Sequence, residues 1–284
     1  MSVKKVGVVG CGLMGAGIIQ TCAQSGFDVT ALEVKQEALD KGIGSIDSIL
    51  GKKVEKGKLD QKDKNTIMGR INGTTQYSDF SDCDLVIEAV FENIDVKKKV
   101  FQKLDTICKK DAIFATNTSV LSVINIASAT TRLENVLGMH FFFPVPVMKL
   151  LELVKTLATS DETITCAKEF AAAIGKESIV APDIPGFVVN RLFAPFQVSA
   201  IRMLEEKIAT AEDIDKGTTL GLGHPMGMLT LSDIQGLDTL LDVVRAFYDA
   251  TGNPNLMPPI LLENMVAAGW LGRKTGKGFY DYKK

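Results

Sequence analysis

The sequence is poor in the residues from which disulfide frameworks and metal sites are built. Its 284 residues include two histidines and five cysteines. The cysteines are scattered, with no Cys-x-x-Cys pair and no histidine close by, so we expect free thiols in a reducing compartment and no zinc site. They are Cys11, Cys22, Cys83, Cys108 and Cys166.

A surplus of one charge and long apolar runs are also lacking. The 32 basic and 34 acidic residues leave a formal charge of −2, which gives no basic excess for nucleic acid or an anionic membrane. Apolar runs are short and interrupted by charges, and no signal peptide precedes the first strand-like segment. We therefore expect a cytoplasmic protein with no nucleic-acid or membrane partner.

The first half instead alternates short apolar runs with amphipathic stretches of helical spacing. This rhythm predicts an α/β fold with a Rossmann-like, mostly parallel sheet covered by helices on both faces. The expected strands are residues 6–9, 28–32, 85–87, 112–115, 136–141, 151–156 and 178–181, with a helix at about 161–174.

One insertion interrupts this rhythm, because no strand candidate lies between Glu33 and Thr74. A helical hairpin is expected there, at about residues 36–70, with a second helix after Leu59. The first helix is indicated by helically spaced aliphatic residues, namely Ile43, Ile46, Ile49, Leu50 and Val54. Lysines cluster near the bend, among them Lys52, Lys53 and Lys56.

The character of the sequence changes at residues 183–186. Helix-length apolar periodicity follows, so residues 1–183 are expected to form the Rossmann domain and residues 184–284 an all-helical C-terminal domain. About 100 residues is small for a two-layer domain, so we expect a homodimer through this part.

A glycine-rich motif directly follows the first expected strand. Gly10-Cys11-Gly12-Leu13-Met14-Gly15 has the Gly-x-Gly-x-x-Gly pattern, in which glycines allow a tight turn, close approach of a pyrophosphate and helix–strand packing. Glu33 ends the next strand and is placed to accept hydrogen bonds from ribose hydroxyls, which favours NAD over NADP. The competing interpretation is a glycine-rich turn without a ligand.

His140 is the histidine best placed for chemistry. It ends an expected strand, where ligands collect in open α/β sheets, and Glu152 lies on the next strand. A carboxylate that reaches the imidazole orients it and favours its protonated form. From periodicity alone, a structural histidine and a solvated carboxylate remain the alternatives.

Several motifs together resemble the L-3-hydroxyacyl-CoA dehydrogenase family, in order and spacing from residue 4 to residue 282. Besides the glycine motif and the hairpin, they are residues 117–119 (NTS), 140–142 (HFF), 146–150 (PVMKL), 185–191 (PGFVVNR), 221–227 (GLGHPMG), 236–238 (GLD) and 274–280 (KTGKGFY). The length is closest to that of bacterial members acting on 3-hydroxybutyryl-CoA. The resemblance implies an NAD-dependent enzyme that interconverts (S)-3-hydroxyacyl-CoA and 3-ketoacyl-CoA.

The resemblance also implies roles for individual residues. His140 would be the general base, Glu152 would hold its tautomer, and Ser119 and Asn190 would hydrogen-bond the substrate. Asn190 would come from the helical domain, which places the site in a cleft between domains. A helix cap by Asn117 or Ser119, and an ordinary early-helix position for Asn190, are the plain alternatives.

Further binding residues follow from the same resemblance. Glu92, Lys97 and Lys274, with Ser119 and Phe143, would contact NAD. Lys52, Lys53 and Lys56 would meet the phosphates of coenzyme A, although a charged run is usually a solvated face.

Two positions depart from the family pattern. Phe143 stands where an asparagine near the nicotinamide is usual, and Met228 stands where a proline is common. Loss of an amide hydrogen bond is worth about 1 kcal/mol. The alternative functions are a β-hydroxyacid dehydrogenase for free acids, which would rely on a lysine in the helical domain, and a non-catalytic, crystallin-like member.

Overall fold

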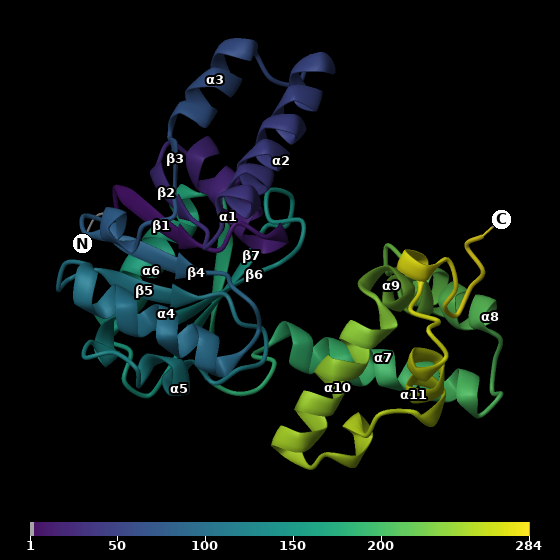
Figure 1. The fold of residues 1–284 in the computed structure, drawn as a ribbon. Coiled ribbons are helices and arrows are strands. Elements are labelled where there is room, and N and C mark those ends of the chain that lie inside the picture. Colours follow the sequence, from purple (N-terminus) through teal and green to yellow (C-terminus); the bar gives the residue numbers. More distant parts are fainter. Residues whose placement is uncertain (1–2, 284) are drawn as a thin grey trace. The chain divides into compact units, whose positions relative to one another are not determined.

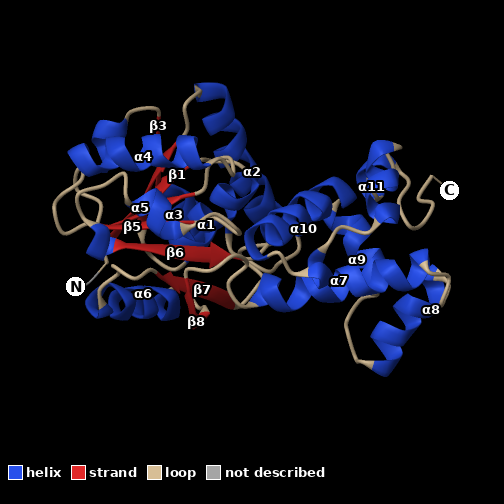
Figure 2. Ribbon diagram, turned by 90° about the horizontal axis from the view of Figure 1, so that it is seen from below, coloured by secondary structure: helices blue, strands red, loops and turns tan. Residues whose placement is uncertain are grey.

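The computed structural model describes residues 3–283 and divides into two units, one up to Phe187 and one from Val188 onward. Figure 1 traces the chain through both, and Figure 2 shows that strands gather in the first unit while helices make up the second.

The first unit is built on one eight-stranded sheet of order β3-β2-β1-β4-β5-β6-β7-β8. Every neighbouring pair is parallel except β6 and β7, which are antiparallel. The strands are β1 Lys5–Val9, β2 Asp28–Leu32, β3 Ile71–Thr74, β4 Leu85–Glu88, β5 Ile113–Thr116, β6 Val136–Phe141, β7 Leu150–Lys155 and β8 Glu177–Pro182. The predicted mostly parallel sheet is thus confirmed.

Helices connect these strands. They are α1 Leu13–Gln24, α2 Gln36–Glu55, α3 Gln61–Gly69, α4 Ile94–Ile107, α5 Val123–Ala127 and α6 Asp161–Ala173, with short 3-10 turns at Tyr77–Phe80 and Leu133–Asn135. The central strands β1, β4 and β5 are almost fully buried, which explains why their sequences read as continuous apolar runs.

Strand β3 contradicts the expectation that no strand lies before Thr74. Its sequence, Ile-Asn-Gly-Thr, has little β propensity, and its two middle residues are exposed. Pairing with β2 gives this segment its extended conformation. A glycine is needed at position 73, because a Cβ there would lie 2.7 Å from Ile43 Cδ1. Such a short polar edge strand carries no periodic signal in the sequence.

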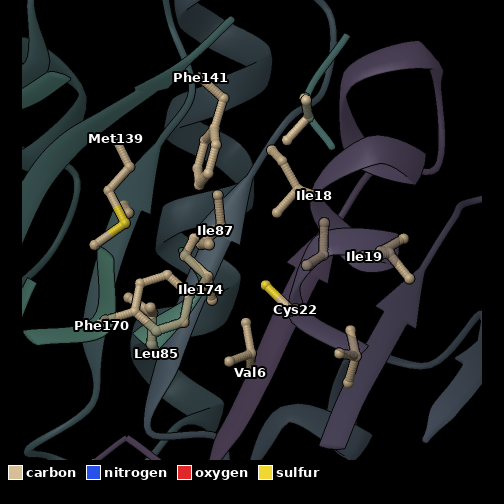
Figure 3. Packing of buried hydrophobic residues seen from close by; sticks show 14 of the residues in the cluster. Val6, Ile18, Ile19, Cys22, Leu85, Ile87, Met139, Phe141, Phe170 and Ile174 are labelled. Atoms are coloured by element: carbon tan, nitrogen blue, oxygen red, sulfur yellow. The ribbon is translucent and has the colours of Figure 1, made fainter. Parts of the chain in front are cut away.

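The core of this unit lies between the sheet and the helices that cover it. Figure 3 shows Ile18, Ile19 and Cys22 of α1 facing strand residues such as Ile87, with Phe170 of α6 beside them. These side chains are at most 2% exposed. Truncating one large aliphatic or aromatic side chain in such a core costs about 2–5 kcal/mol.

The hairpin of α2 and α3 has the expected position. Ile46 and Leu50 are buried, and Lys64 of α3 pairs with Asp47 of α2 at 2.8 Å. Ile49, another of the helically spaced aliphatic residues of α2, is 47% exposed and lines a cavity.

The second unit is helical, as predicted. Its helices are α7 Val189–Glu205, α8 Ala211–Lys216, α9 Met228–Gln235, α10 Leu237–Thr251 and α11 Ile260–Ala267, with shorter turns at Gly217–Gly221, Pro254–Leu256 and Arg273–Thr275. Buried Asp233 of α9 accepts hydrogen bonds from Phe279 N, Tyr280 N and Tyr282 Oη at 3.0–3.1 Å. Asp233 thereby ties the C-terminal segment to the helices. In residues 3–283 no helix combines the length and the apolar character needed to cross a membrane.

Candidate active site

The glycine motif forms a tight turn between β1 and α1. Gly10 has φ +101°, which L side chains rarely adopt, and a Cβ at Gly15 would lie 1.9 Å from Gly10 O. A Cβ at Gly12, in contrast, would have no atom within 4 Å. No side chain of the described residues caps α1, so its N-terminal N–H groups are available to an anion.

Glu33 follows β2 directly and faces this turn. Its Oε2 accepts from Cys11 N at 3.1 Å and its Oε1 from Val34 N at 2.8 Å. It borders a cavity of about 460 Å³ that the glycine turn and the residues after β4 also line. This arrangement fits the adenosine ribose and pyrophosphate of a dinucleotide.

Cys11 lies inside the motif. Its side chain is buried, and burial together with Glu33 raises the pKa of the thiol to about 12. A neutral thiol is a small apolar residue here.

His140 and Glu152 form a buried pair across two strands. The antiparallel register of β6 and β7 places them directly opposite each other, and His140 Nδ1 lies 2.6 Å from Glu152 Oε2. Glu152 is completely buried, so the alternative of a solvated carboxylate is wrong. A buried carboxylate opposite Nδ1 fixes the imidazole tautomer and the orientation of the ring.

Ser119 lies on the other side of the imidazole. Its Oγ is 3.2 Å from His140 Nε2, which gives the array Ser119–His140–Glu152. Neither Ser119 nor Asn117 caps the following helix, because Ser122 does so. Asn117 Oδ1 instead accepts from Phe141 N at 2.9 Å, a contact that fixes the strand end beside His140.

Two aromatic rings enclose the imidazole. Phe142 and Phe187 lie with ring centroids 4.6 Å and 5.6 Å from that of His140. They exclude water from the ring and strengthen the hydrogen bonds on both nitrogens. Both phenylalanines belong to motifs visible in the sequence, residues 140–142 and 185–191, but neither motif indicated that these rings contact the histidine.

Glu92 connects this array to the loop after β4. Its Oε1 accepts from Ser119 N at 3.0 Å and from the Thr118 hydroxyl, and its Oε2 lies 3.2 Å from Lys97 Nζ. Lys97 is only 1% exposed and also pairs with Glu88 Oε1 at 2.8 Å. The ion pair with Lys97 therefore fixes the position of Glu92 in this loop. A direct contact of Lys97 with NAD stays a prediction.

Glu88 was not among the residues expected from the sequence. It is fully buried at the end of β4 and accepts from Lys97, from Thr116 Oγ1 at 2.7 Å and from Val90 N at 2.7 Å. A carboxylate that ends a buried apolar strand is the sequence signal that could have revealed it.

A second, larger cavity of about 870 Å³ lies between α1, α2 and the loop that joins β6 to β7. Phe143, 56% exposed, and Val147 line it from the loop, while Ile49 and Lys53 line it from α2. Lys52 and Lys56, the other two lysines expected to meet a phosphate, are exposed at the end of α2 and do not line this cavity.

The remaining predicted residues belong to the second unit. Asn190 is the second residue of α7. Lys274 Nζ lies 2.5 Å from both carboxylate oxygens of Asp238. Burial raises the pKa of Asp238, but the hydrogen bond and charge of Lys274, together with backbone hydrogen bonds from Thr239 and Asp238 itself, outweigh this and leave the pKa below its ordinary value. Contacts of Asn190 and Lys274 with ligands stay predictions.

A dinucleotide turn with an acidic residue after β2, close to a serine–histidine–carboxylate array, defines a nicotinamide-dependent oxidoreductase. Comparison with known proteins gives the family. Residues 5–184 match the model of the 3-hydroxyacyl-CoA dehydrogenase NAD binding domain, and residues 186–282 match that of the C-terminal domain. The chain belongs to the 3-hydroxyacyl-CoA dehydrogenase family.

Individual relatives match over nearly their whole length. A 3-hydroxybutyryl-CoA dehydrogenase from Clostridioides difficile is 44% identical, with 99% of this chain and 100% of the relative covered. One from Bradyrhizobium diazoefficiens is 42% identical, with 99% and 96% covered. The solved structure of (S)-3-hydroxybutyryl-CoA dehydrogenase from Ralstonia eutropha is 43% identical, with TM-score 0.97 and both chains fully covered.

Proposed function

We propose that the protein is an NAD-dependent dehydrogenase that interconverts (S)-3-hydroxybutyryl-CoA and acetoacetyl-CoA. The observation that carries this proposal is the Ser119–His140–Glu152 array beside a dinucleotide turn. The names of the relatives support the four-carbon thioester.

The array suits proton transfer at a carbon-bound hydroxyl. With Glu152 accepting a hydrogen bond from the N–H at Nδ1, His140 presents the lone pair of Nε2 toward Ser119. In oxidation, Nε2 takes the proton of the 3-hydroxyl, and in reduction the imidazolium returns a proton to that oxygen. NAD, when bound, supplies the hydride acceptor or donor. Ser119 Oγ hydrogen-bonds the same oxygen and supports the charge that develops on it.

The larger cavity is the place we propose for the coenzyme A moiety. Lys53 borders it, and Lys52, the residue before it, and Lys56, one turn after it, are exposed, where their charges attract phosphates. Asn190 would complete the substrate contacts from the second unit. An apolar pantetheine arm suits the aliphatic walls of this cavity.

Exposed aliphatic side chains and the state of the cysteines support proposals on oligomeric state and cellular location. The second unit exposes several large aliphatic side chains, including Leu220 at 85% and Leu192 at 73%, which favours a homodimer through this unit. Four cysteines, namely Cys11, Cys22, Cys83 and Cys108, are buried free thiols, which favours the reducing cytoplasm.

The test is oxidation of NADH by purified protein with acetoacetyl-CoA, compared with NADPH and with free acetoacetate. Turnover of the thioester with NADH is the expected result. Preferential turnover of the free acid would identify a β-hydroxyacid dehydrogenase instead. Binding of NADH without turnover would identify a non-catalytic member of the family.

A further inference from the structure

We propose that Lys176 is a positioning residue that holds the loop of residues 142–149 as a wall of the 870 Å³ cavity and so sets the affinity for the acyl-CoA substrate. The inference rests on the proposed function, because it takes this cavity to receive coenzyme A. It assigns a task to a buried cation that the chemistry at His140 does not use.

Lys176 lies in the turn between α6 and β8. Gly175, with φ +71°, ends the helix, and the backbone N of Lys176 donates to Ala171 O at 2.8 Å. The residue is 8% exposed. Its ammonium donates to Val145 O at 2.5 Å and to Met148 O at 2.6 Å.

No carboxylate among residues 3–283 lies within ion-pair distance of this ammonium. Burial of a charge without a counter-ion is costly and lowers the pKa of Lys176 below its ordinary value. The two carbonyls that it holds belong to the turn at residues 144–148, where Pro144 O already accepts from the N–H groups of Val147 and Met148. The ammonium therefore donates hydrogen bonds to two carbonyls, Val145 O and Met148 O, that the hydrogen bonds within the turn do not use.

The same turn has a second anchor on α1. Val145 is 1% exposed, and a Cβ at Gly17 would lie 2.9 Å from Val145 Cβ. Val145 is thus fixed through its side chain by Gly17 and through its carbonyl by Lys176. Both anchors determine where Phe143 and Val147 stand along the cavity wall.

The loop also joins the strands that carry His140 and Glu152, but that pair is fixed independently by the β6–β7 ladder. Loosening the turn should therefore weaken substrate binding more than catalysis. The smaller cavity, where we place the adenosine end of NAD, has no wall from this loop. Of this loop only Phe143 was expected to contact NAD, so binding of NADH should change less than binding of the thioester.

The test compares Lys176→Met with wild type in acetoacetyl-CoA reduction. We expect KM for the thioester to rise by about tenfold, with kcat and the Kd of NADH within about threefold. Lys176→Arg, whose guanidinium can reach both carbonyls, should restore KM. Gly17→Ala, which displaces the same turn from the other side, should raise KM as well.

Arg132→Met is the matched control. Arg132 also donates to backbone carbonyls, Lys109 O and Asp105 O, but just ahead of β6, at the opposite end of that strand from the loop. An equal rise of KM in Arg132→Met, or an unchanged KM in both Lys176→Met and Gly17→Ala, would overturn the inference. If wild type fails to reduce acetoacetyl-CoA, the proposed function fails, and calorimetry with coenzyme A still decides the inference. Weaker binding by Lys176→Met supports it, while equal binding, or none by wild type, overturns it.

Discussion

Replacing Glu152 by glutamine tests directly whether the carboxylate keeps His140 in the tautomer that acts as a base. The substitution keeps the size of the side chain and removes its charge. In the native pair the carboxylate lies 2.6 Å from Nδ1, and both side chains are buried. A glutamine that turns its amide N–H toward Nδ1 moves the imidazole proton to Nε2, the nitrogen that faces Ser119 and must accept the substrate proton.

The size of the effect follows from the hydrogen bond that is lost. A charge-assisted hydrogen bond contributes about 1.5–3 kcal/mol, and each 1.4 kcal/mol is about tenfold in rate. Adding the tautomer change, we expect kcat for oxidation of (S)-3-hydroxybutyryl-CoA to fall by about 10²-fold, within the 10²–10⁴-fold that general base catalysis supplies. KM should stay within about threefold, because Glu152 is buried behind the imidazole.

The assay is the initial rate of NAD reduction, on protein whose thermal unfolding shows that it is folded. Glu177→Gln is the matched control, since Glu177 is exposed on β8, the strand next to β7. A folded Glu152→Gln enzyme that keeps kcat within about threefold of wild type would refute the role given to the pair.

Three further predictions concern the cofactor site and stability. Gly12→Val should fold normally but lose NADH binding, measured by fluorescence, because its side chain enters the open space beside α1; NADH binding equal to that of wild type would contradict this. Gly15→Ala should unfold at a lower temperature than wild type, because its Cβ would lie 1.9 Å from Gly10 O. Glu33→Ala should raise the NADPH-to-NADH ratio of kcat/KM by at least about tenfold, because it removes the charge that repels a 2′-phosphate, and an unchanged ratio would count against that role. Burial raises the pKa of the Cys22 thiol from 9.0 to about 12, so the unfolded chain loses this proton first, and the contribution of Cys22 to stability should fall by about 1.4 kcal/mol between pH 7 and pH 10. Guanidinium titrations of wild type and of Cys22→Ala at both pH values measure this contribution, because the fall should be smaller in the variant by that amount.

The strands with strong apolar runs could be predicted closely from the sequence. Residues 28–32 and 136–141 were expected as strands and are β2 and β6 with those bounds. Strand β3 could not be predicted, because its Asn-Gly centre gains its extended form from pairing with β2 alone. Local propensity is a weak guide where tertiary pairing decides.

Some features of the candidate site could likewise be predicted from the sequence, and others could not. The glycine turn and the His140–Glu152 pairing follow from strand ends that the sequence reveals. The partners of buried charges do not, because Lys97 stands beside Lys98 and Lys99 in a charged helix, and only the folded chain shows that Lys97 alone is buried on Glu88. The contact of Lys176 with residues 145 and 148 joins segments about thirty residues apart, which no local pattern encodes.

The central claim is that His140 transfers the proton while a nicotinamide transfers the hydride. The most direct measurement is the rate of acetoacetyl-CoA reduction by NADH in wild type and in His140→Gln, together with the Kd of NADH for each. The account predicts turnover by wild type, a fall in kcat of at least about 10²-fold in the variant, and an unchanged Kd. A variant that binds NADH and keeps kcat within about threefold of wild type would contradict it.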